Sequence, residues 1–375
     1  MKQLSILIKP ASAACNLRCK YCFYADISRI RSTASYGIMK ISLLDTMLEN
    51  IRSELKPLDR ITFAFQGGEP TLAGLAFFQH FTEVVSQWDP GIHVDYSLQT
   101  NGILLDDDWC AFLKAHNFLT GLSLDLLPRE HSDARIFPSG EGSWKQACAA
   151  LALLKKHRVE YNVLCTLTNR IARHPREVWK QICKLDIPYV QFTPCLNDME
   201  AAEQGAFALE PKHFASFYKE LFPLWLQDFR AGKYRSVKFF DDLVNLLAFG
   251  RVTACGMTGR CQSQIIVESD GSVYPCDFYC LDQYCLGNIA KDTLSVLLFS
   301  PKTGAFVGRP HTIPTLCGNC QFAKICGGNC KRMQSSMCCT GDESYCGYRD
   351  FLTGCYRDLA VIALQQRNFR LQGRF

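Results

Sequence analysis

The chain has 375 residues, enough for two or three domains with a buried core. Hydrophobic residues make up 48% and charged residues 21%, which excludes a disordered or fibrous chain and indicates a folded, water-soluble protein. The net charge of +5 is too small and too dispersed for a dedicated nucleic-acid binder, and no apolar run approaches the roughly 18 residues of a membrane span. We therefore expect a cytoplasmic protein with neither nucleic acid nor membrane as a partner.

Short apolar runs alternate with longer segments of helical period over the first half of the chain, which predicts repeated βα units. The expected strands are residues 5–9, 60–65, 93–98, 119–124, 160–167 and 189–192. The expected amphipathic helices between them include residues 43–55, 76–88 and 144–157. Six such units predict an α/β fold, a partial (β/α)6 TIM-like barrel that stays open.

Polar or glycine-rich residues follow the expected strands at 66–70, 99–101, 123–125, 166 and 193–194. Parallel α/β folds place their active sites at this edge, so these positions are candidates for the site. For 101–102 and 106–108 the expected roles are a turn and a helix cap.

The pattern changes after the helical stretch 211–229, and from Cys255 onward cysteine and glycine replace the βα rhythm. We predict two domains, residues 1–234 and 235–375. A turn signal at 269–272 between two β-prone runs predicts a β-hairpin over 265–274, and 349–375 has the period of a helix.

Cysteine is the unusual feature, with 21 residues in a chain too large to need disulfides. Cys15, Cys19 and Cys22 form C-x3-C-x2-C directly after the first strand. Three thiolates suit a four-iron cluster with one iron open to a cofactor, because sulfur ligands favour iron–sulfur centres. A structural zinc site would need a fourth ligand, and neither His nor Cys stands nearby in the sequence.

With Tyr21 before its third cysteine and Gly67-Gly68-Glu69-Pro70 after the second strand, this motif resembles the radical S-adenosylmethionine superfamily. The resemblance implies that the open iron binds S-adenosyl-L-methionine and that a 5'-deoxyadenosyl radical is formed from it. It also implies that the glycines let backbone carbonyls approach the methionine amino group, and that Glu69 organises the loop.

Eight more cysteines in the carboxyl half resemble the SPASM domain, which implies two further [4Fe-4S] clusters and three in all. The resemblance assigns one cluster to Cys255, Cys261, Cys276 and Cys330, and the other to Cys317, Cys320, Cys326 and Cys346. Zinc is the alternative, because C-x2-C pairs bind it readily. Cys280, Cys285, Cys338, Cys339 and Cys355 lie outside this pattern.

Within the superfamily the chain is most similar to the anaerobic sulfatase-maturating enzymes, over stretches 7–12, 22–24, 35–39, 63–74, 97–102 and 267–279. This resemblance implies oxidation of one cysteine or serine of a sulfatase, in a Cys/Ser-x-Pro/Ala-x-Arg motif, to formylglycine. It further implies an electron donor such as flavodoxin or ferredoxin, and a monomeric enzyme.

Carried over by position, the family's cofactor contacts fall on Tyr21, Gln66, Ser123, Arg135 and Leu196. Arg135 could pair with the carboxylate of S-adenosylmethionine, and Tyr21 offers a flat surface. One departure stands out: the family usually has glycine after its Ser-x-Asp, whereas this chain has Leu126.

The family's base falls on Asp277, which directly follows the cluster ligand Cys276. The acceptors of the substrate's proton and electron would therefore be adjacent. Tyr24 is a second candidate, for positioning the substrate. Two alternatives stay open. One is a SPASM-type maturase that crosslinks a ribosomal peptide, although the first strand starts too early to leave room for its usual leader-binding domain. The other is a non-catalytic electron-transfer or zinc-binding scaffold.

Overall fold

The computed structural model describes residues 2–371, and the chain divides into two compact units. The first unit contains the chain up to Leu124 together with Ser132–Tyr161 and Ser263–Arg309. The second contains Asp125–His131, Asn162–Gln262 and the chain from Pro310 onward. Each unit is described by itself below.

The first unit is built on a sheet with the strand order β10-β9-β8-β1-β2-β3-β4. The parallel strands are β1 (Gln3–Ile8), β2 (Arg60–Phe65), β3 (His93–Thr100), β4 (Leu119–Ser123) and β8 (Ile265–Val267). The antiparallel ones are β9 (Ser272–Tyr274) and β10 (Gly287–Asn288). In this register Ile8 lies opposite both Phe65 and Val267, so that the residues directly after β1, β2 and β8 share one edge of the sheet.

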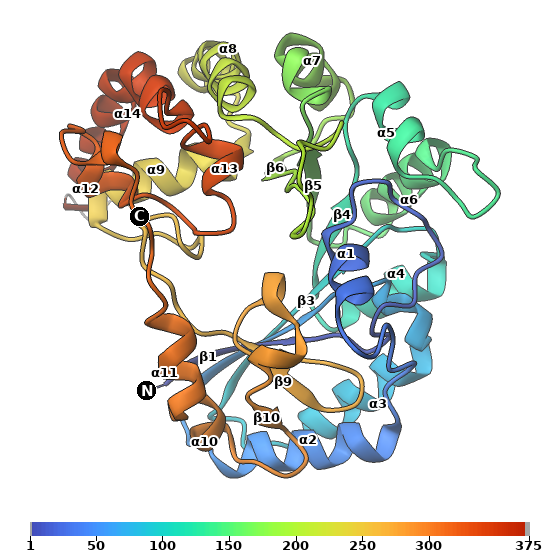
Figure 1. Ribbon diagram of the computed structural model, residues 1–375. Coiled ribbons are helices and arrows are strands. Elements are labelled where there is room, and N and C mark those ends of the chain that lie inside the picture. The colour runs from blue at the N-terminus through green and yellow to red at the C-terminus, as the bar shows by residue number, and fades with distance from the viewer. Residues whose placement is uncertain (1, 372–375) are drawn as a thin grey trace. The chain divides into compact units, whose positions relative to one another are not determined.

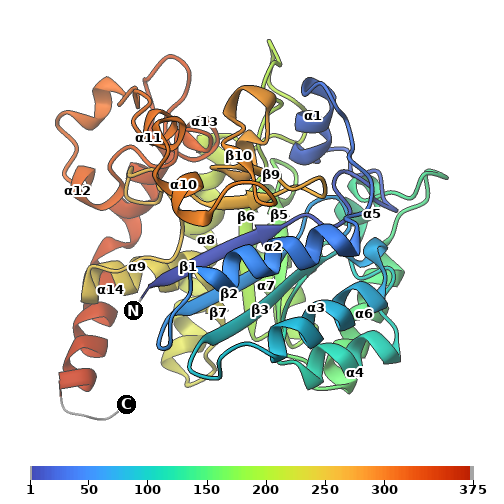
Figure 2. The same ribbon diagram turned by 90° about the horizontal axis from the view of Figure 1, so that it is seen from below.

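Helices of the first unit connect and cover these strands, with α2 and α3 lying along one face (Figure 1; Figure 2). They are α1 (Phe23–Ile30), α2 (Ile41–Ser53), α3 (Leu75–Ser86), α4 (Asp107–Ala115), α6 (Trp144–Lys156), α10 (Leu294–Phe299) and α11 (Pro301–Val307). Phe65 of β2 packs edge-on against Phe78 and Phe81 of α3, with ring centroids 4.9 and 5.0 Å apart. Burial of such aromatic surface fixes α3 against the sheet.

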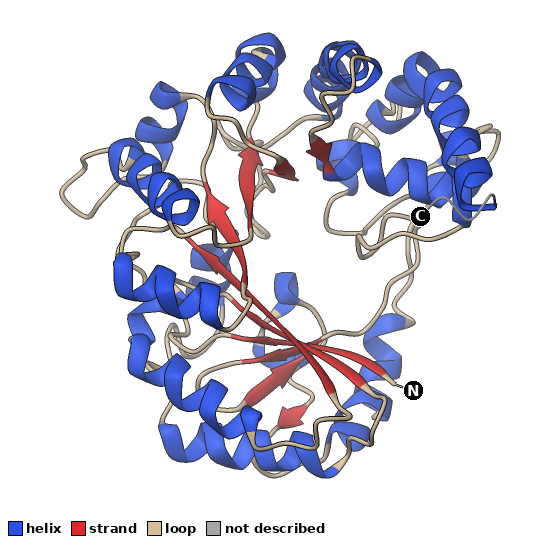
Figure 3. Cartoon of the chain, turned by 180° about the vertical axis from the view of Figure 1, so that it is seen from behind, coloured by secondary structure: helices blue, strands red, loops and turns tan. Residues whose placement is uncertain are grey.

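The second unit also combines parallel strands with helices, drawn red and blue in Figure 3. Its strands are β5 (Tyr161–Leu167), β6 (Tyr189–Pro194) and β7 (Ser236–Val237). Its helices are α7 (Pro175–Lys184), α8 (Pro211–Arg230), α9 (Lys238–Phe249), α12 (Ala323–Cys326), α13 (Gln334–Met337) and α14 (Gly347–Leu371). Rings of Tyr218, Phe239 and Phe351 join α8, α9 and α14 into one core. The short helix α5 (Pro128–Ala134) contributes to both units.

The predicted elements agree closely with these bounds. All six expected strands are present, and the 265–274 hairpin is confirmed as β8 and β9, with Gly271 at a φ of 85° in its turn. The predicted cap is also present, because Asp106 accepts a hydrogen bond from the Trp109 amide at the start of α4. The two-residue strands β7 and β10 were missed, since so short a segment carries no period. The end of the helix predicted over 349–375 lies outside the described residues.

The division at residue 235 stays a prediction, because the compact units are interleaved along the chain. No helix among the described residues is long and apolar enough to cross a membrane.

Candidate active site and cluster sites

Cys15, Cys19 and Cys22 lie on the loop between β1 and α1, and all three are half-buried. The loop is held at its centre, because the amides of Arg18 and Lys20 donate hydrogen bonds to carbonyls near 135 at 2.7 and 3.0 Å. Burial raises the pKa of Cys15 to about 11, so without a metal the thiol keeps its proton at neutral pH, and binding of a metal would displace that proton. Three soft ligands on one anchored loop fit an iron–sulfur cluster with an open position.

The glycine-rich loop after β2 packs directly on this cysteine loop. The Gly68 amide donates to the Ser12 carbonyl at 2.8 Å, and a Cβ on Gly68 would lie only 2.1 Å from the Ala14 carbonyl oxygen. Gly67 has a φ of 124°, which side-chain-bearing residues rarely adopt. The glycines are therefore required for the contact between the two loops, whatever they do toward a cofactor.

Glu69 organises the loop, as expected. Its side chain is 1% exposed and accepts hydrogen bonds from the Thr71 amide, the hydroxyls of Thr71 and Thr100, and the Asn101 amide, at 2.6–3.1 Å. Burial raises its pKa, and these four donors act against that rise. Glu69 thereby ties the ends of β2 and β3 together.

Asp277 begins the short 3-10 helix Asp277–Tyr279, and both of its carboxylate oxygens have partners. Lys9 Nζ lies 2.7 Å from Oδ1, and Gln66 Nε2 donates to Oδ2 at 2.7 Å. Lys9 and Gln66 directly follow β1 and β2, so adjacent strand ends fix this carboxylate from two sides. The Asp277 side chain keeps 16% of its surface exposed, whereas that of Lys9 keeps 1%.

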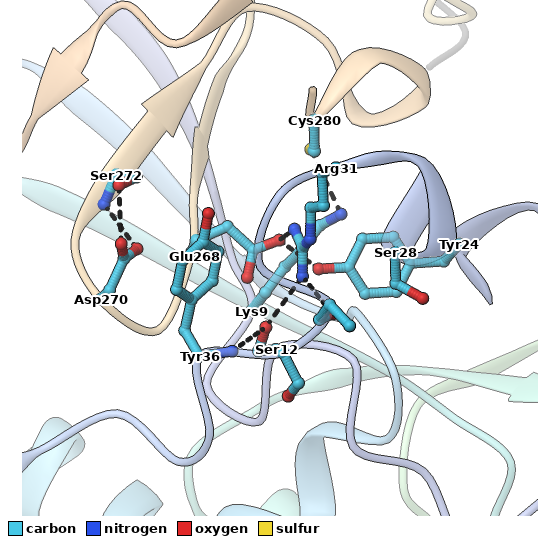
Figure 4. Close-up of polar contacts among 12 residues, drawn as sticks. Lys9, Ser12, Tyr24, Ser28, Arg31, Tyr36, Glu268, Asp270, Ser272 and Cys280 are labelled. Atoms are coloured by element: carbon cyan, nitrogen blue, oxygen red, sulfur yellow. Dashed lines mark hydrogen bonds and ion pairs between the residues drawn. The ribbon is translucent and has the colours of Figure 1, made fainter. Parts of the chain in front are cut away.

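Lys9 belongs to a buried network of charged and aromatic groups, shown in Figure 4. Its ammonium lies 3.6 Å from the centre of the Tyr24 ring, and the Tyr24 hydroxyl donates to Glu268. Arg31 pairs with the same Glu268 oxygen at 2.7 Å and donates to the Ser12 hydroxyl at 3.1 Å. Two cations thus face the carboxylates of Asp277 and Glu268, and the buried charges balance.

The pKa shifts in this network follow from its charges. Burial alone would lower the pKa of Lys9, but Asp277 and the neighbouring anions raise it well above its usual value. Burial alone would raise the pKa of Glu268, but Lys9 and Arg31 bring it below its usual value. Lys9 is therefore charged and Glu268 ionised at neutral pH. Tyr24, expected to position substrate, uses its hydroxyl inside this network.

Sequence reasoning missed Lys9 and Arg31, because nothing in the sequence pattern links them to carboxylates more than 230 residues away. Gln66 donates a hydrogen bond from its side-chain amide to Asp277, and its contact with the cofactor stays a prediction.

The other expected cofactor contacts are distributed over the two units. In the first unit the Arg135 guanidinium lies 5.5 Å from the centre of the Tyr21 ring, and Ser123 ends β4. Leu196 belongs to the second unit. Leu126 stands where the family usually has glycine. It is fully buried and adopts a φ of 54°.

Seven of the expected auxiliary-cluster thiols lie in the second unit. Four of them line one pocket together with Tyr348 and Phe322: Cys317, Cys320, Cys326 and Cys346. Burial raises the pKa of Cys326 to about 11, and the other three thiols add to that rise. Burial also raises the pKa of Cys255, with further effects from Cys330 and Cys261 nearby. The eighth, Cys276, lies in the first unit.

No group of three or more His, Cys, Asp or Glu side chains in residues 2–371 is placed to hold one metal ion. The fit to iron–sulfur clusters therefore rests on the soft donor set and on the cysteine-lined pocket.

Comparison with known proteins places these sites in a family. The radical SAM superfamily matches residues 10–183, and the iron–sulfur cluster-binding (SPASM) domain matches residues 255–321. The chain is 40% identical to a cysteine-type anaerobic sulfatase-maturating enzyme of Clostridium novyi, over 88% of this chain and 89% of the relative. It is 28% identical to a serine-type enzyme of Bacteroides thetaiotaomicron, over 91% and 86%. The solved structure of native anSMEcpe with bound AdoMet matches with a TM-score of 0.88 and 38% identity, covering 96% of this chain and 99% of that one.

The fold and the cysteine loop, with these matches, define a radical S-adenosylmethionine enzyme that carries iron–sulfur clusters. Within that class, the chain belongs to the anaerobic sulfatase-maturating enzymes. The predicted family, open α/β fold and cofactor classes are thereby confirmed. The peptide-crosslinking and scaffold alternatives have less support.

The buried ion pair gives a first testable prediction. Arg31→Met leaves Glu268 buried with one of its two cations removed, and we expect the free energy of unfolding to fall by about 3 kcal/mol. The matched control is Arg52→Met, which breaks an exposed pair with Glu49 and should cost less than about 1 kcal/mol. Urea unfolding under anaerobic conditions measures both, and equal losses would contradict the prediction.

Proposed function

We propose that this enzyme oxidises a cysteine of a sulfatase to Cα-formylglycine. We choose cysteine because the chain is 40% identical to a cysteine-type relative but 28% identical to a serine-type one, at similar coverage of the chain. The serine of a sulfatase is the second candidate substrate. Conversion of a thiol to an aldehyde removes two electrons in all and replaces sulfur with the oxygen of water.

We assign the first cluster to Cys15, Cys19 and Cys22, with one iron left for S-adenosylmethionine. Bound there, S-adenosylmethionine supplies a 5'-deoxyadenosyl radical that takes a hydrogen atom from the substrate Cβ. For its carboxylate we assign Arg135, whose guanidinium lies over the Tyr21 ring. Ser123 and Leu196 remain proposed contacts, and Gln66 is better suited to hold Asp277.

Asp277 is the proposed catalytic base. After loss of the Cβ hydrogen, the substrate thiol must lose a proton as the remaining electron departs, and a thioaldehyde forms. Asp277 accepts this proton, for which its partly exposed carboxylate is held by Lys9 and Gln66. Water then adds to the thioaldehyde carbon, and hydrogen sulfide leaves to give the aldehyde. The ion pair with Lys9 and the hydrogen bond from Gln66 fix the position of this carboxylate.

The eight remaining family cysteines would hold two auxiliary clusters, which would supply an acceptor for the electron released at the substrate. The one ligated by Cys276 adjoins Asp277 in the sequence, so proton and electron acceptors are neighbours. We further propose that flavodoxin or ferredoxin supplies electrons, that the enzyme works as a monomer, and that its target lies in a Cys-x-Pro/Ala-x-Arg motif.

Matched peptides test the substrate. The reduced enzyme is incubated anaerobically with S-adenosylmethionine and with Cys-x-Pro-x-Arg or Ser-x-Pro-x-Arg peptides of otherwise identical sequence. We expect the aldehyde, seen by mass spectrometry, to form at least about ten times faster from the cysteine peptide, a difference of about 1.4 kcal/mol in transition-state binding. Faster reaction of the serine peptide would reverse the assignment, and a crosslinked peptide without aldehyde would overturn it.

A further inference from the structure

Two extra cysteines lie next to the pocket lined by Cys317, Cys320, Cys326 and Cys346. Cys338 and Cys339 follow α13 directly, and both are buried, at 3% and 6% exposure. Neither belongs to the set of eight that resembles the family pattern. Cys338 and Cys339 lie beside thiols that are proposed metal ligands. Cys355 in α14 is a buried cysteine outside this pocket.

Cys339 and Cys346 face each other at the base of a closed turn. The two residues form an isolated antiparallel β-bridge, and the Gly347 amide donates to the Cys338 carbonyl at 2.7 Å. The turn between them is fixed, because Asp342 accepts hydrogen bonds from the Thr340 hydroxyl and from the Ser344 amide. Residues paired in this way have Cβ atoms about 4.5–5.5 Å apart. The register therefore holds the two side chains next to each other.

The two thiols also lie near each other. The bridge places Cys346 beside Cys339, and Cys317 is a further thiol in the neighbourhood of Cys339. Cys346 is a lining residue of the pocket, and its bridge to Cys339 places a second thiol beside it. A four-iron cluster held only by the protein takes four thiolates, and this side of the unit offers a fifth beside the fourth.

We propose that Cys339 is an alternative ligand of the second auxiliary cluster, able to take the place of Cys346. The inference rests on the proposed cluster at this pocket. In the exchange, the Cys339 thiol gives up its proton and forms an Fe–S bond, while the Cys346–Fe bond breaks and the Cys346 thiolate takes up a proton. No electron is transferred, and the cluster keeps four thiolate ligands from the protein.

Iron and sulfide content after anaerobic reconstitution tests this without reference to activity. Cys346→Ala alone should keep about twelve irons per chain, whereas Cys346→Ala with Cys339→Ala should fall to about eight. The matched control is Cys346→Ala with Cys355→Ala, which removes a buried thiol of the same unit and should keep about twelve. The proposal gives Cys320 no neighbouring thiol that could replace it. Cys320→Ala should therefore lower the iron content to about eight per chain.

Two results would overturn the inference: loss of about four irons from Cys346→Ala alone, or retention of about twelve by the double variant lacking Cys339. Retention of about twelve irons by Cys320→Ala, or zinc in place of iron, is a different failure. It would overturn the proposed cluster at this pocket, and with it the exchange.

Discussion

With Cys15, Cys19 and Cys22 all changed to alanine, we expect the reconstituted protein to hold about eight irons per chain in place of about twelve, and to lose all cleavage of S-adenosylmethionine. The reason is that these thiols are the only protein ligands proposed for the first cluster. The eight cysteines proposed as ligands of the auxiliary clusters are far away in the sequence, and seven of them lie in the second unit. The auxiliary clusters should therefore persist.

The control must remove three thiols of similar burial that carry no proposed ligand role. Cys148, Cys183 and Cys285 are half-buried like the three loop cysteines, so their triple change to alanine separates cluster loss from general damage. Iron analysis and the yield of 5'-deoxyadenosine from the anaerobically reduced proteins measure both effects. Cleavage that survives the loop variant, or vanishes equally in the control, would show that the first site has been misread.

Most of the fold could be predicted from the sequence, because the signals were local. The strand predicted over 60–65 has the bounds of β2, since its alternation of apolar residues ends at a glycine-rich turn. The C-x3-C-x2-C motif was equally clear in the sequence, because its three cysteines lie within one loop. Elements of two residues, such as β7, have no period to detect.

The partners of Asp277 could not be predicted in the same way. Lys9 reaches this carboxylate only because β8 pairs with β1 in parallel, which places a late segment beside the first strand. In the sequence, Lys9 is a charged residue before a proline, and such residues are usually exposed. Long-range register, and not residue type, identified it as a buried partner of the proposed base.

Leu126 shows how burial can override a local preference. A leucine at positive φ costs about 1–2 kcal/mol relative to the right-handed region, which is why glycine is the usual residue at such a position. Complete burial of a leucine side chain contributes about 1.5–3 kcal/mol. The apolar contacts therefore offset the strain, and the backbone turn is kept without the glycine that a sequence motif would require.

The largest effect at constant iron content is expected from Asp277→Asn. The amide keeps the shape of the side chain but cannot accept the substrate proton, so formylglycine output should fall by about 100-fold or more. Formation of 5'-deoxyadenosine depends on the first cluster instead and should continue, increasingly uncoupled from product. Mass spectrometry of the peptide, with chromatography of the nucleoside, measures this ratio.

The control for this variant comes from the ion pair itself. Asp277→Asn leaves the buried ammonium of Lys9 without its 2.7 Å partner, and that unpaired charge alone could disturb the site. Combining it with Lys9→Met removes the charge, so a base role predicts that the double variant is still uncoupled, whereas a charge-burial effect predicts recovery of aldehyde. Near-normal aldehyde from Asp277→Asn with about twelve irons retained would falsify the base assignment. A loss of about four irons would instead make Asp277 a structural support of the cluster ligated by Cys276.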